Sequence, residues 1–240
     1  MPKPEPSLSV AGPAAGQGRA VRPPASSPRV AVDAVLFTIS DDRLQTLLVN
    51  IKTGPFAGRW AFPGGLVELG ESLDGAAYRE LYEKTGVRDL YLEQLFTFGD
   101  AGRDPAWHTV AVAYFALVPH FERGLKRGDK YADIDWFPVH DLPQLAYDHS
   151  AIAAYALKRL QAKLGYTNIV YSLLPDEFTL REIQAIYEVI LNHKLDRRNF
   201  RRKILALGLL KPLPKTRHGA HRPAALYTFT QRRPMNVGVL

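Results

Sequence analysis

A glycine-rich segment that leads into a short charged helix constrains the fold of this 240-residue chain more than any other feature of its sequence. Ser72 is a suitable N-cap and Gly86 a suitable C-terminal stop, so a helix is predicted over 72–85. The charges and glycines at fixed spacing are Gly65, Glu71, Arg79, Glu80, Glu83 and Gly86. Residues three and four apart share one helix face, so the side chains at 80, 83 and 84 are expected to lie within about one turn of each other.

Runs typical of β-strands lie on both sides of this helix in the sequence. The first begins at Arg29 and alternates with a period of two, and a turn at 40–43 separates it from a second run at 44–51. Further strands are predicted at 91–98, 109–118 and 134–138, and a second helix at 148–164. Strands with interspersed helices over 29–165 indicate an α/β or α+β sandwich.

The pattern from Gly65 to Val87 resembles the Nudix box, GX5EX7REUXEEXGU, at every fixed position but one. The resemblance implies a Nudix fold, and it implies a chemistry in which glutamates hold Mg²⁺ against a nucleoside diphosphate while water attacks the diphosphate linkage. Lys84 stands where the family has its second consecutive glutamate. An ammonium group offers no lone pair to a metal, and Lys84 is well placed, four residues after Glu80, to pair with that carboxylate. We therefore expect a damaged metal site and no required cofactor.

Two interpretations of the altered box stay open. In one, Glu71, Glu80 and Glu83 form an ordinary solvated, salt-bridged helix face. In the other, Glu80 and Glu83 keep a weak Mg²⁺ site. No catalytic residue is assigned with either interpretation, and the degenerate box consists of Glu71, Arg79, Glu80, Glu83 and Lys84.

Nucleotide binding in this fold does not depend only on the catalytic metal, so ligand-binding residues are expected near the box. An arginine can bridge a diphosphate with two hydrogen bonds, and an aromatic ring can stack on a base. The two aromatic candidates equally fit core positions on a strand. A polar loop at 100–108 follows a predicted strand, and such loops often line ligand sites. The candidates are Arg59, Trp60, Phe62, Gly64, Gly65, Arg103 and Asp104.

Charge is distributed unevenly along the chain. The net charge is +7, yet residues 194–233 hold twelve lysines and arginines against one acid, Asp196, which gives this segment +11 and leaves −4 for the rest. An acidic body with a compact basic C-terminal segment is typical of a protein that carries a nucleic-acid-binding module. A solvated basic tail is the alternative.

The C-terminal third has the helix pattern of a DNA-binding motif. Thr179 is predicted to cap a helix over 179–192, and Glu182 completes a capping box. A second helix is predicted over 196–207 and ends before Gly208. Two helices joined by about four residues match a helix-turn-helix. The fold class is therefore an α/β (α+β) Nudix sandwich followed by a winged helix-turn-helix domain.

The wing is predicted from two strands, 209–213 and 225–230, that flank a basic loop at 215–222. On the second helix Arg198, Asn199 and Arg202 point away from the apolar face, and arginine and asparagine can read guanine and adenine in the major groove. The loop offers cations for phosphate or minor-groove contact. The DNA-binding candidates are Arg197, Arg198, Asn199, Arg201, Arg202, Lys203, Lys215, Arg217, His218 and Arg222; a merely solvated basic face is the alternative.

Both halves together resemble the Nudix-related transcriptional regulators, the NrtR family. The resemblance covers 29–230 and rests on the stretches 195–203, 207–210, 222–227 and 91–100. It implies a homodimeric bacterial repressor of NAD biosynthesis or salvage genes that binds a palindromic operator and senses ADP-ribose or a related NAD metabolite. The competing interpretation is an active hydrolase of ADP-ribose or another nucleoside diphosphate, with the winged helix only a dimerisation or regulatory appendage. Lys84 is the feature that discriminates between the two, although a repressor with this altered box can keep residual Nudix pyrophosphatase activity.

Composition suggests the remaining boundaries. Residues 1–28 are rich in Pro, Ala, Gly and Ser and are expected to form a disordered arm. We expect a Nudix-like ligand-sensing domain at 29–165, a winged helix domain at 166–232 and a tail at 233–240. The chain has no cysteine, which excludes a disulfide framework, a thiolate zinc site and a catalytic thiol. With no long apolar run and no apolar leader, a cytoplasmic, nucleoid-associated protein with no membrane partner is expected.

Overall fold

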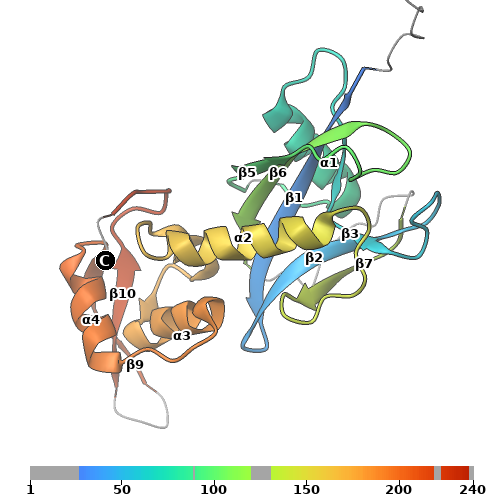
Figure 1. The fold of residues 1–240 in the computed structure, drawn as a ribbon. Coiled ribbons are helices and arrows are strands. Elements are labelled where there is room, and N and C mark those ends of the chain that lie inside the picture. Colours follow the sequence, from blue (N-terminus) through green and yellow to red (C-terminus); the bar gives the residue numbers. More distant parts are fainter. Residues whose placement is uncertain (1–26, 89, 120–130, 219–222, 238–240) are drawn as a thin grey trace, which may run out of the picture.

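The computed structural model describes residues 27–88, 90–119, 131–218 and 223–237, which form two packed lobes (Figure 1). The larger lobe is built on a seven-stranded sheet with the order β3-β2-β1-β6-β5, in which β4 also pairs with β1 and β7 with β2. Its strands are β1 (Arg29–Ser40), β2 (Arg43–Ile51), β3 (Trp60–Ala61), β4 (Gly64–Leu66), β5 (Glu93–Phe98), β6 (Thr109–Leu117) and β7 (Tyr131–Pro138). Strands β1 and β6 are parallel, and the other pairs are antiparallel.

The central strand β1 is buried on both faces, because a helix covers each side of the sheet. Leu36 faces α1 (Leu73–Thr85) within a cluster that includes Ala77 and Leu81. Val35 faces the opposite way, toward α2 (His149–Lys163), in a second cluster with Ile152. The helix-covered sheet agrees with the α/β sandwich predicted from the sequence.

The smaller lobe combines helices with a three-stranded sheet of order β8-β10-β9. Its elements are the 3₁₀ helix η1 (Ile169–Leu173), β8 (Phe178–Thr179), α3 (Leu180–Leu191), α4 (Arg197–Ala206), β9 (Leu210–Arg217) and β10 (Ala224–Phe229). The predicted capping box is present, since Thr179 Oγ1 accepts from the Glu182 backbone and Glu182 accepts from the Thr179 backbone. Asn192 ends α3 with φ +57°, and Gly208 follows α4 with φ +64°. The order of helices and strands is that of a winged helix.

One apolar cluster runs through both lobes and joins them. It includes Val35 and Phe115 of the large sheet, Leu160 of α2, and Ile183 and Phe229 of the small lobe. At the junction, the Gln161 side chain of α2 donates to the Ile190 carbonyl of α3 at 3.0 Å. The two lobes therefore share a core rather than meeting only through a linker.

Several predicted boundaries were wrong by a few residues. Strand β5 begins at Glu93 rather than Tyr91, β7 begins at Tyr131 rather than Ile134, and β9 extends to Arg217 instead of ending at 213. Strands β3, β4 and β8 were not predicted, because each has two or three residues and exists only through pairing with a distant strand. Residues 1–26 of the predicted arm, and Arg222 of the predicted loop, lie outside the described residues. Over the described part of the chain, no helix is long and apolar enough to cross a membrane.

Candidate functional site

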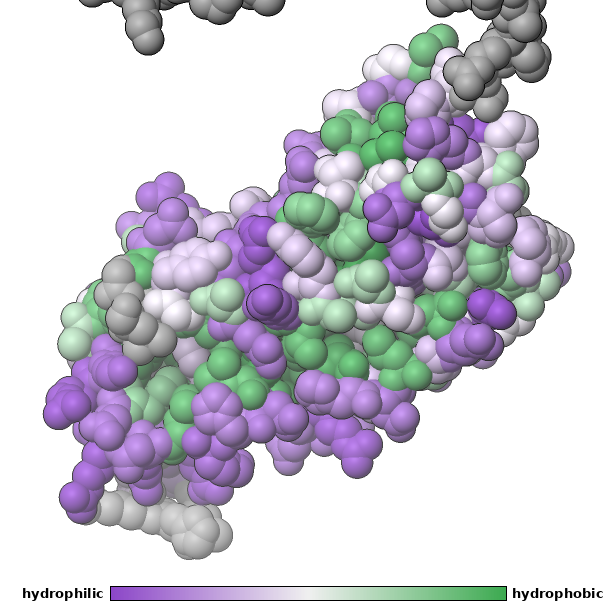
Figure 2. All heavy atoms as spheres, viewed as in Figure 1, coloured by the Kyte–Doolittle hydropathy of each residue, from purple (hydrophilic) through white to green (hydrophobic). Residues whose placement is uncertain are grey.

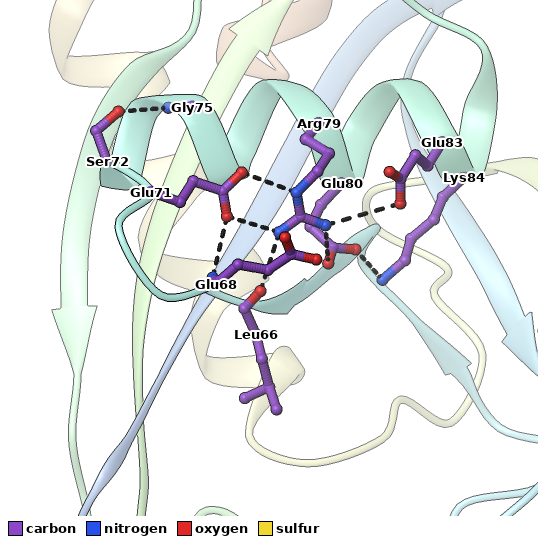
Figure 3. Close-up of polar contacts among 9 residues, drawn as sticks. All are labelled: Leu66, Glu68, Glu71, Ser72, Gly75, Arg79, Glu80, Glu83 and Lys84. Carbon is purple, nitrogen blue, oxygen red and sulfur yellow. Dashed lines mark hydrogen bonds and ion pairs between the residues drawn. The ribbon is translucent and has the colours of Figure 1, made fainter.

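Arg79 on α1 organises the Nudix-box side chains (Figure 3). Its Nε and Nη2 donate to the two carboxylate oxygens of Glu71, each at 2.8 Å. Its Nη1 donates to Glu80 Oε1 at 2.8 Å, and Nη2 also donates to the Leu66 carbonyl at 3.1 Å. The hydrogen bonds from Arg79 and from the Glu68 backbone lower the pKa of Glu71 to about 2. The loop before α1 is thus tied to the helix by a charged network.

Lys84 completes this network from the other side of Glu80. Its Nζ lies 2.5 Å from Glu80 Oε2, so each oxygen of this carboxylate contacts a different cation. Both residues are buried, at 8% exposure. Burial acts to raise the pKa of Glu80, but Lys84 and Arg79 outweigh it and lower that pKa. Burial likewise acts to lower the pKa of Lys84, but Tyr131 and Glu80 outweigh it and raise that pKa. The predicted Lys84–Glu80 pair is confirmed.

This arrangement does not fit a conventional Mg²⁺ site. Hard cations take several oxygen ligands, and both Glu80 oxygens are engaged by side-chain cations. The Glu83 carboxylate is 57% exposed and lies 3.7 Å from Arg79 Nη1. Within the described ranges, no group of three or more His, Cys, Asp or Glu side chains could hold a metal ion. The prediction of a solvated face was right for Glu83 but wrong for Glu80, because the loop at Gly65 packs directly onto the Glu80 carboxylate.

Gly65 is required for that packing. A Cβ at this position would lie 2.3 Å from Glu80 Oε1, and a Cβ at Gly64 would lie 2.3 Å from Asp33 Oδ1. The two glycines therefore pass between carboxylates on β1 and α1. Only a residue without a side chain allows the backbone to approach both so closely.

Three of the predicted ligand-binding side chains have structural positions instead. Phe62 is 2% exposed and stacks on His149 with ring centroids 5.4 Å apart, so it belongs to the core. Arg103 is 8% exposed and donates to both carboxylate oxygens of Asp148, at 3.0 and 2.7 Å. Asp104 accepts from the Ala106 backbone and from Thr109, which fixes its own loop. Each of these side chains is thus engaged within the protein, and its role in ligand binding stays a prediction.

Arg59 and Trp60 are half-buried at the edge of the sheet. Trp60 packs edge-on against Phe137 at 4.6 Å, which agrees with the core alternative for part of its ring. The Arg59 guanidinium lies 5.6 Å from the centre of the Phe56 ring. Both side chains remain partly accessible at the surface of the large lobe.

A buried polar cluster beneath this surface was not predicted. Asp33 on β1, 7% exposed, lies 3.6 Å from Arg103 Nη2 and 3.6 Å from His149 Nε2. His149 Nδ1 accepts from the Phe62 backbone at 2.9 Å, so the proton of the neutral ring is on Nε2 and faces Asp33. Burial lowers the pKa of His149. An acid within the apolar run of β1 was the one sequence signal that could have revealed this cluster.

The surface of α4 carries the predicted DNA-binding cations. Ile204 faces the core at 4% exposure, and Phe200 and Leu207 pack partly against it, as predicted. Arg202 donates to Asn199 Oδ1 at 3.0 Å, so these two side chains are presented together. Hydrophilic side chains gather over the outer end of this lobe in Figure 2. All six candidates on the helix are exposed: Arg197, Arg198, Asn199, Arg201, Arg202 and Lys203.

The wing cations differ from those of α4, because acids of the same lobe pair with them. Lys215 Nζ lies 2.6 Å from Glu177 Oε1. Arg217 Nη1 lies 2.5 Å from Glu182 Oε1, and its Nη2 donates to the Glu177 carbonyl at 3.0 Å. His218 is exposed, with Nε2 at 3.3 Å from Thr216 Oγ1. These contacts hold β9 against the first turn of α3 and against the residue that precedes β8.

Family models match both lobes. The model described as "NUDIX domain" matches residues 27–160, and the model described as "NrtR DNA-binding winged helix domain" matches residues 170–229. The "ADPR responsive transcriptional repressor NtrR" of Acinetobacter baylyi is 37% identical over 207 residues, which cover 85% of this chain and 82% of that protein.

Solved structures agree with these matches. The crystal structure of Shewanella oneidensis NrtR complexed with a 27mer DNA has a TM-score of 0.72 and 35% identity, over 84% of this chain and 93% of that one. The NUDIX domain of the same protein complexed with ADP ribose has a TM-score of 0.52 and 38% identity, over 56% of this chain and 90% of that one. The chain described above therefore belongs to the NrtR family of Nudix-related transcriptional regulators, in which a winged helix DNA-binding domain follows a NUDIX domain.

Proposed function

We propose that this protein is a transcriptional repressor that binds operator DNA through its winged helix and responds to ADP-ribose bound by its Nudix domain. The observation that carries the proposal is the similarity to the Acinetobacter repressor, which extends over both domains. The exposed cations of α4 support it from the geometry. The regulated genes would be those of NAD biosynthesis or salvage, and the protein would act in the cytoplasm at the nucleoid.

DNA recognition is assigned to α4. Arg198, Asn199 and Arg202 are exposed on one helix, and these residue types make bidentate contacts to guanine or adenine in the major groove. Arg197, Arg201 and Lys203 supply further exposed cations for phosphates. The wing residues Lys215, Arg217, His218 and Arg222 would contact the backbone or minor groove, with the first two oriented by their acidic partners.

The protein would act as a homodimer on a palindromic operator. Two recognition helices must then lie about 34 Å, or a multiple of it, apart to meet successive half-sites. ADP-ribose would favour a dimer geometry with a different spacing. A differential affinity of about 100-fold between the two states corresponds to about 2.7 kcal/mol, which suffices for induction. The apolar cluster shared by the two lobes connects the Nudix lobe to α3 through continuous side-chain packing. A structural change on ligand binding would reach α3 through these contacts.

Ligand binding is assigned to the Nudix lobe around the box. The Gly64–Gly65 backbone, Arg59 and the exposed part of Trp60 would contact the nucleotide. Lys84 and Arg79 engage the carboxylates of Glu80 and Glu71, which a metal ion would otherwise use as ligands. This arrangement is less suited to metal-assisted hydrolysis than to binding.

A second candidate is hydrolysis of ADP-ribose or another nucleoside diphosphate, because Glu71, Arg79 and Glu83 keep their places in the box. Purified protein with Mg²⁺ should hydrolyse ADP-ribose slowly or not at all if the repressor is the main function. A turnover in the usual enzymatic range, about 1 to 1,000 per second, would instead favour the hydrolase.

Fluorescence anisotropy of DNA from upstream of NAD-synthesis genes of the same genome tests the repressor. Tight, sequence-selective binding that ADP-ribose weakens is the expected result. Selective binding that ignores ADP-ribose would keep the regulator and reject this effector. Weak, salt-sensitive binding to any DNA would reduce the basic segment to a nonspecific patch and count against the repressor.

A further inference from the structure

Tyr147 adopts a backbone conformation that its residue type disfavours. Its φ is +51°, in the left-handed region where a bulky side chain is an outlier. The residues on both sides are fixed: the Ala146 backbone donates to the Trp60 carbonyl at 2.8 Å, and His149 accepts from the Phe62 backbone. The strained geometry is therefore imposed by its neighbours, and a glycine would fit the backbone better.

The Tyr147 side chain stays partly open to solvent although it contacts a buried ring, since its ring centroid lies 5.4 Å from that of His149. The residue is 41% exposed, and no hydrogen bond of its hydroxyl to the described residues is present. It packs against Phe56, with ring centroids 4.4 Å apart and planes tilted by 51°. A large ring kept at a strained and exposed position is a candidate for a functional contact.

The surroundings of this ring resemble a binding site for one end of a nucleotide. The Arg59 guanidinium lies 5.6 Å from the Phe56 ring, which places a cation beside two aromatic faces. The nearby carboxylates of Asp104 and Asp33 add to burial in raising the pKa of Tyr147. Tyr131, which also raises this pKa, holds its ring 5.4 Å from the Lys84 ammonium. Phe56 and Tyr131 pack against one apolar cluster, so the aromatic pair lies near the Nudix-box network.

We propose that Tyr147 and Phe56, with Arg59 beside them, bind the base of a nucleoside diphosphate whose phosphates lie toward the Nudix box. Every base has a π-face, and stacking on aromatic side chains requires no hydrogen-bond readout. The guanidinium of Arg59 can bind phosphate oxygens with two hydrogen bonds. This inference rests on the proposed function, and it adds the residues that would bind the base.

The test compares Tyr147→Gly, Tyr147→Asn and Tyr147→Phe with the wild-type protein by calorimetric titration of ADP-ribose and of ADP. Glycine and asparagine both tolerate the left-handed backbone, so the fold should keep or gain thermal stability. Loss of one base–aromatic stack should weaken binding about 5- to 150-fold. Tyr147→Phe keeps the ring and should bind like the wild type. Tyr166→Gly removes a tyrosine of similar exposure, 43%, and serves as the control.

Saturation-transfer NMR supplies a readout that a structural role would not change. The adenine protons of ADP-ribose should lose saturation in Tyr147→Gly while the ribose protons retain it. Wild-type affinity in Tyr147→Gly, or a lower melting temperature together with weaker binding, would overturn the inference. If the wild type binds ADP but not ADP-ribose, the proposed effector is wrong and the same comparison with ADP decides the base site. Binding of neither compound by the wild type would overturn both.

Discussion

Replacing Lys84 with methionine tests the buried network directly. Methionine has a similar length and a high helix propensity, so the main change is the loss of the ammonium 2.5 Å from Glu80 Oε2. Breaking a buried ion pair by removing one partner costs about 3–5 kcal/mol. Arg79 still donates to Glu80 Oε1, so the low end, about 3 kcal/mol, is expected. For a chain of this size that loss corresponds to a fall in Tm of about 6–12 °C.

The pH dependence gives the same prediction a second readout. The pKa of Glu80 is lowered in the folded state, so its contribution to stability is present above the unfolded pKa and is lost as the pH falls through the folded one. The pKa of Lys84 is raised, so its contribution is fully present at neutral pH. The difference between Lys84→Met and wild type should therefore be largest near pH 7 and shrink below about pH 4.5.

Urea denaturation followed by circular dichroism measures both effects. Lys158→Met, an exposed lysine on α2, is the matched control and should leave the free energy of unfolding unchanged. Combining Lys84→Met with Glu80→Gln removes the buried carboxylate that has lost one of its two cations and should recover part of the loss. A Lys84→Met protein as stable as wild type within about 0.5 kcal/mol, the scatter of neutral surface changes, would refute the account of the network.

Four further outcomes are expected. Lys84→Glu places a third carboxylate beside those of Glu80 and Glu83, so calorimetry should detect Mn²⁺ or Mg²⁺ binding that the wild type lacks; equal binding by both proteins would contradict the metal argument. Arg202→Ala should weaken operator binding in anisotropy titrations by about 1–3 kcal/mol and relax the preference for one base; unchanged affinity would contradict the assignment of α4 as the recognition helix. Arg201→Ala should reduce the slope of log affinity against log salt concentration for DNA binding by about one phosphate contact, and Arg217→Ala should reduce this slope less, because Arg217 pairs with an acid of its own lobe. His149→Asn should flatten the stability profile between about pH 5 and pH 6.5, since the lowered pKa of His149 makes the wild type lose stability as the pH falls below the unfolded value.

Local rules accounted for the features predicted correctly. The ends of α1 and α3 follow from Ser72 and Thr179, whose side chains accept from backbone groups three residues away. The Lys84–Glu80 pair follows from a four-residue separation on one helix. In each case the contact partners are close in sequence, so residue type and spacing suffice.

Long-range contacts account for what was missed. Phe62 is buried against His149, 87 residues away, which contacts both its backbone and its ring. Arg103 is buried because Asp148, 45 residues away, accepts its guanidinium. The strained φ of Tyr147 has no signature in residue type at all, since it arises from pairing between its segment and β3.

The ion pair at Glu80 bears on what kind of signal such a protein reports. An enzyme that consumed its nucleotide would respond to the rate of supply, because each molecule bound would be destroyed. With an ammonium built into the helix in place of a carboxylate ligand, the proposed repressor would release its nucleotide intact. The fraction of repressor with bound nucleotide would then follow the free concentration of that nucleotide at equilibrium. It would not depend on the Mg²⁺ level of the cell. In the proposed repressor, the lysine at position 84 would thus make the response to the nucleotide reversible.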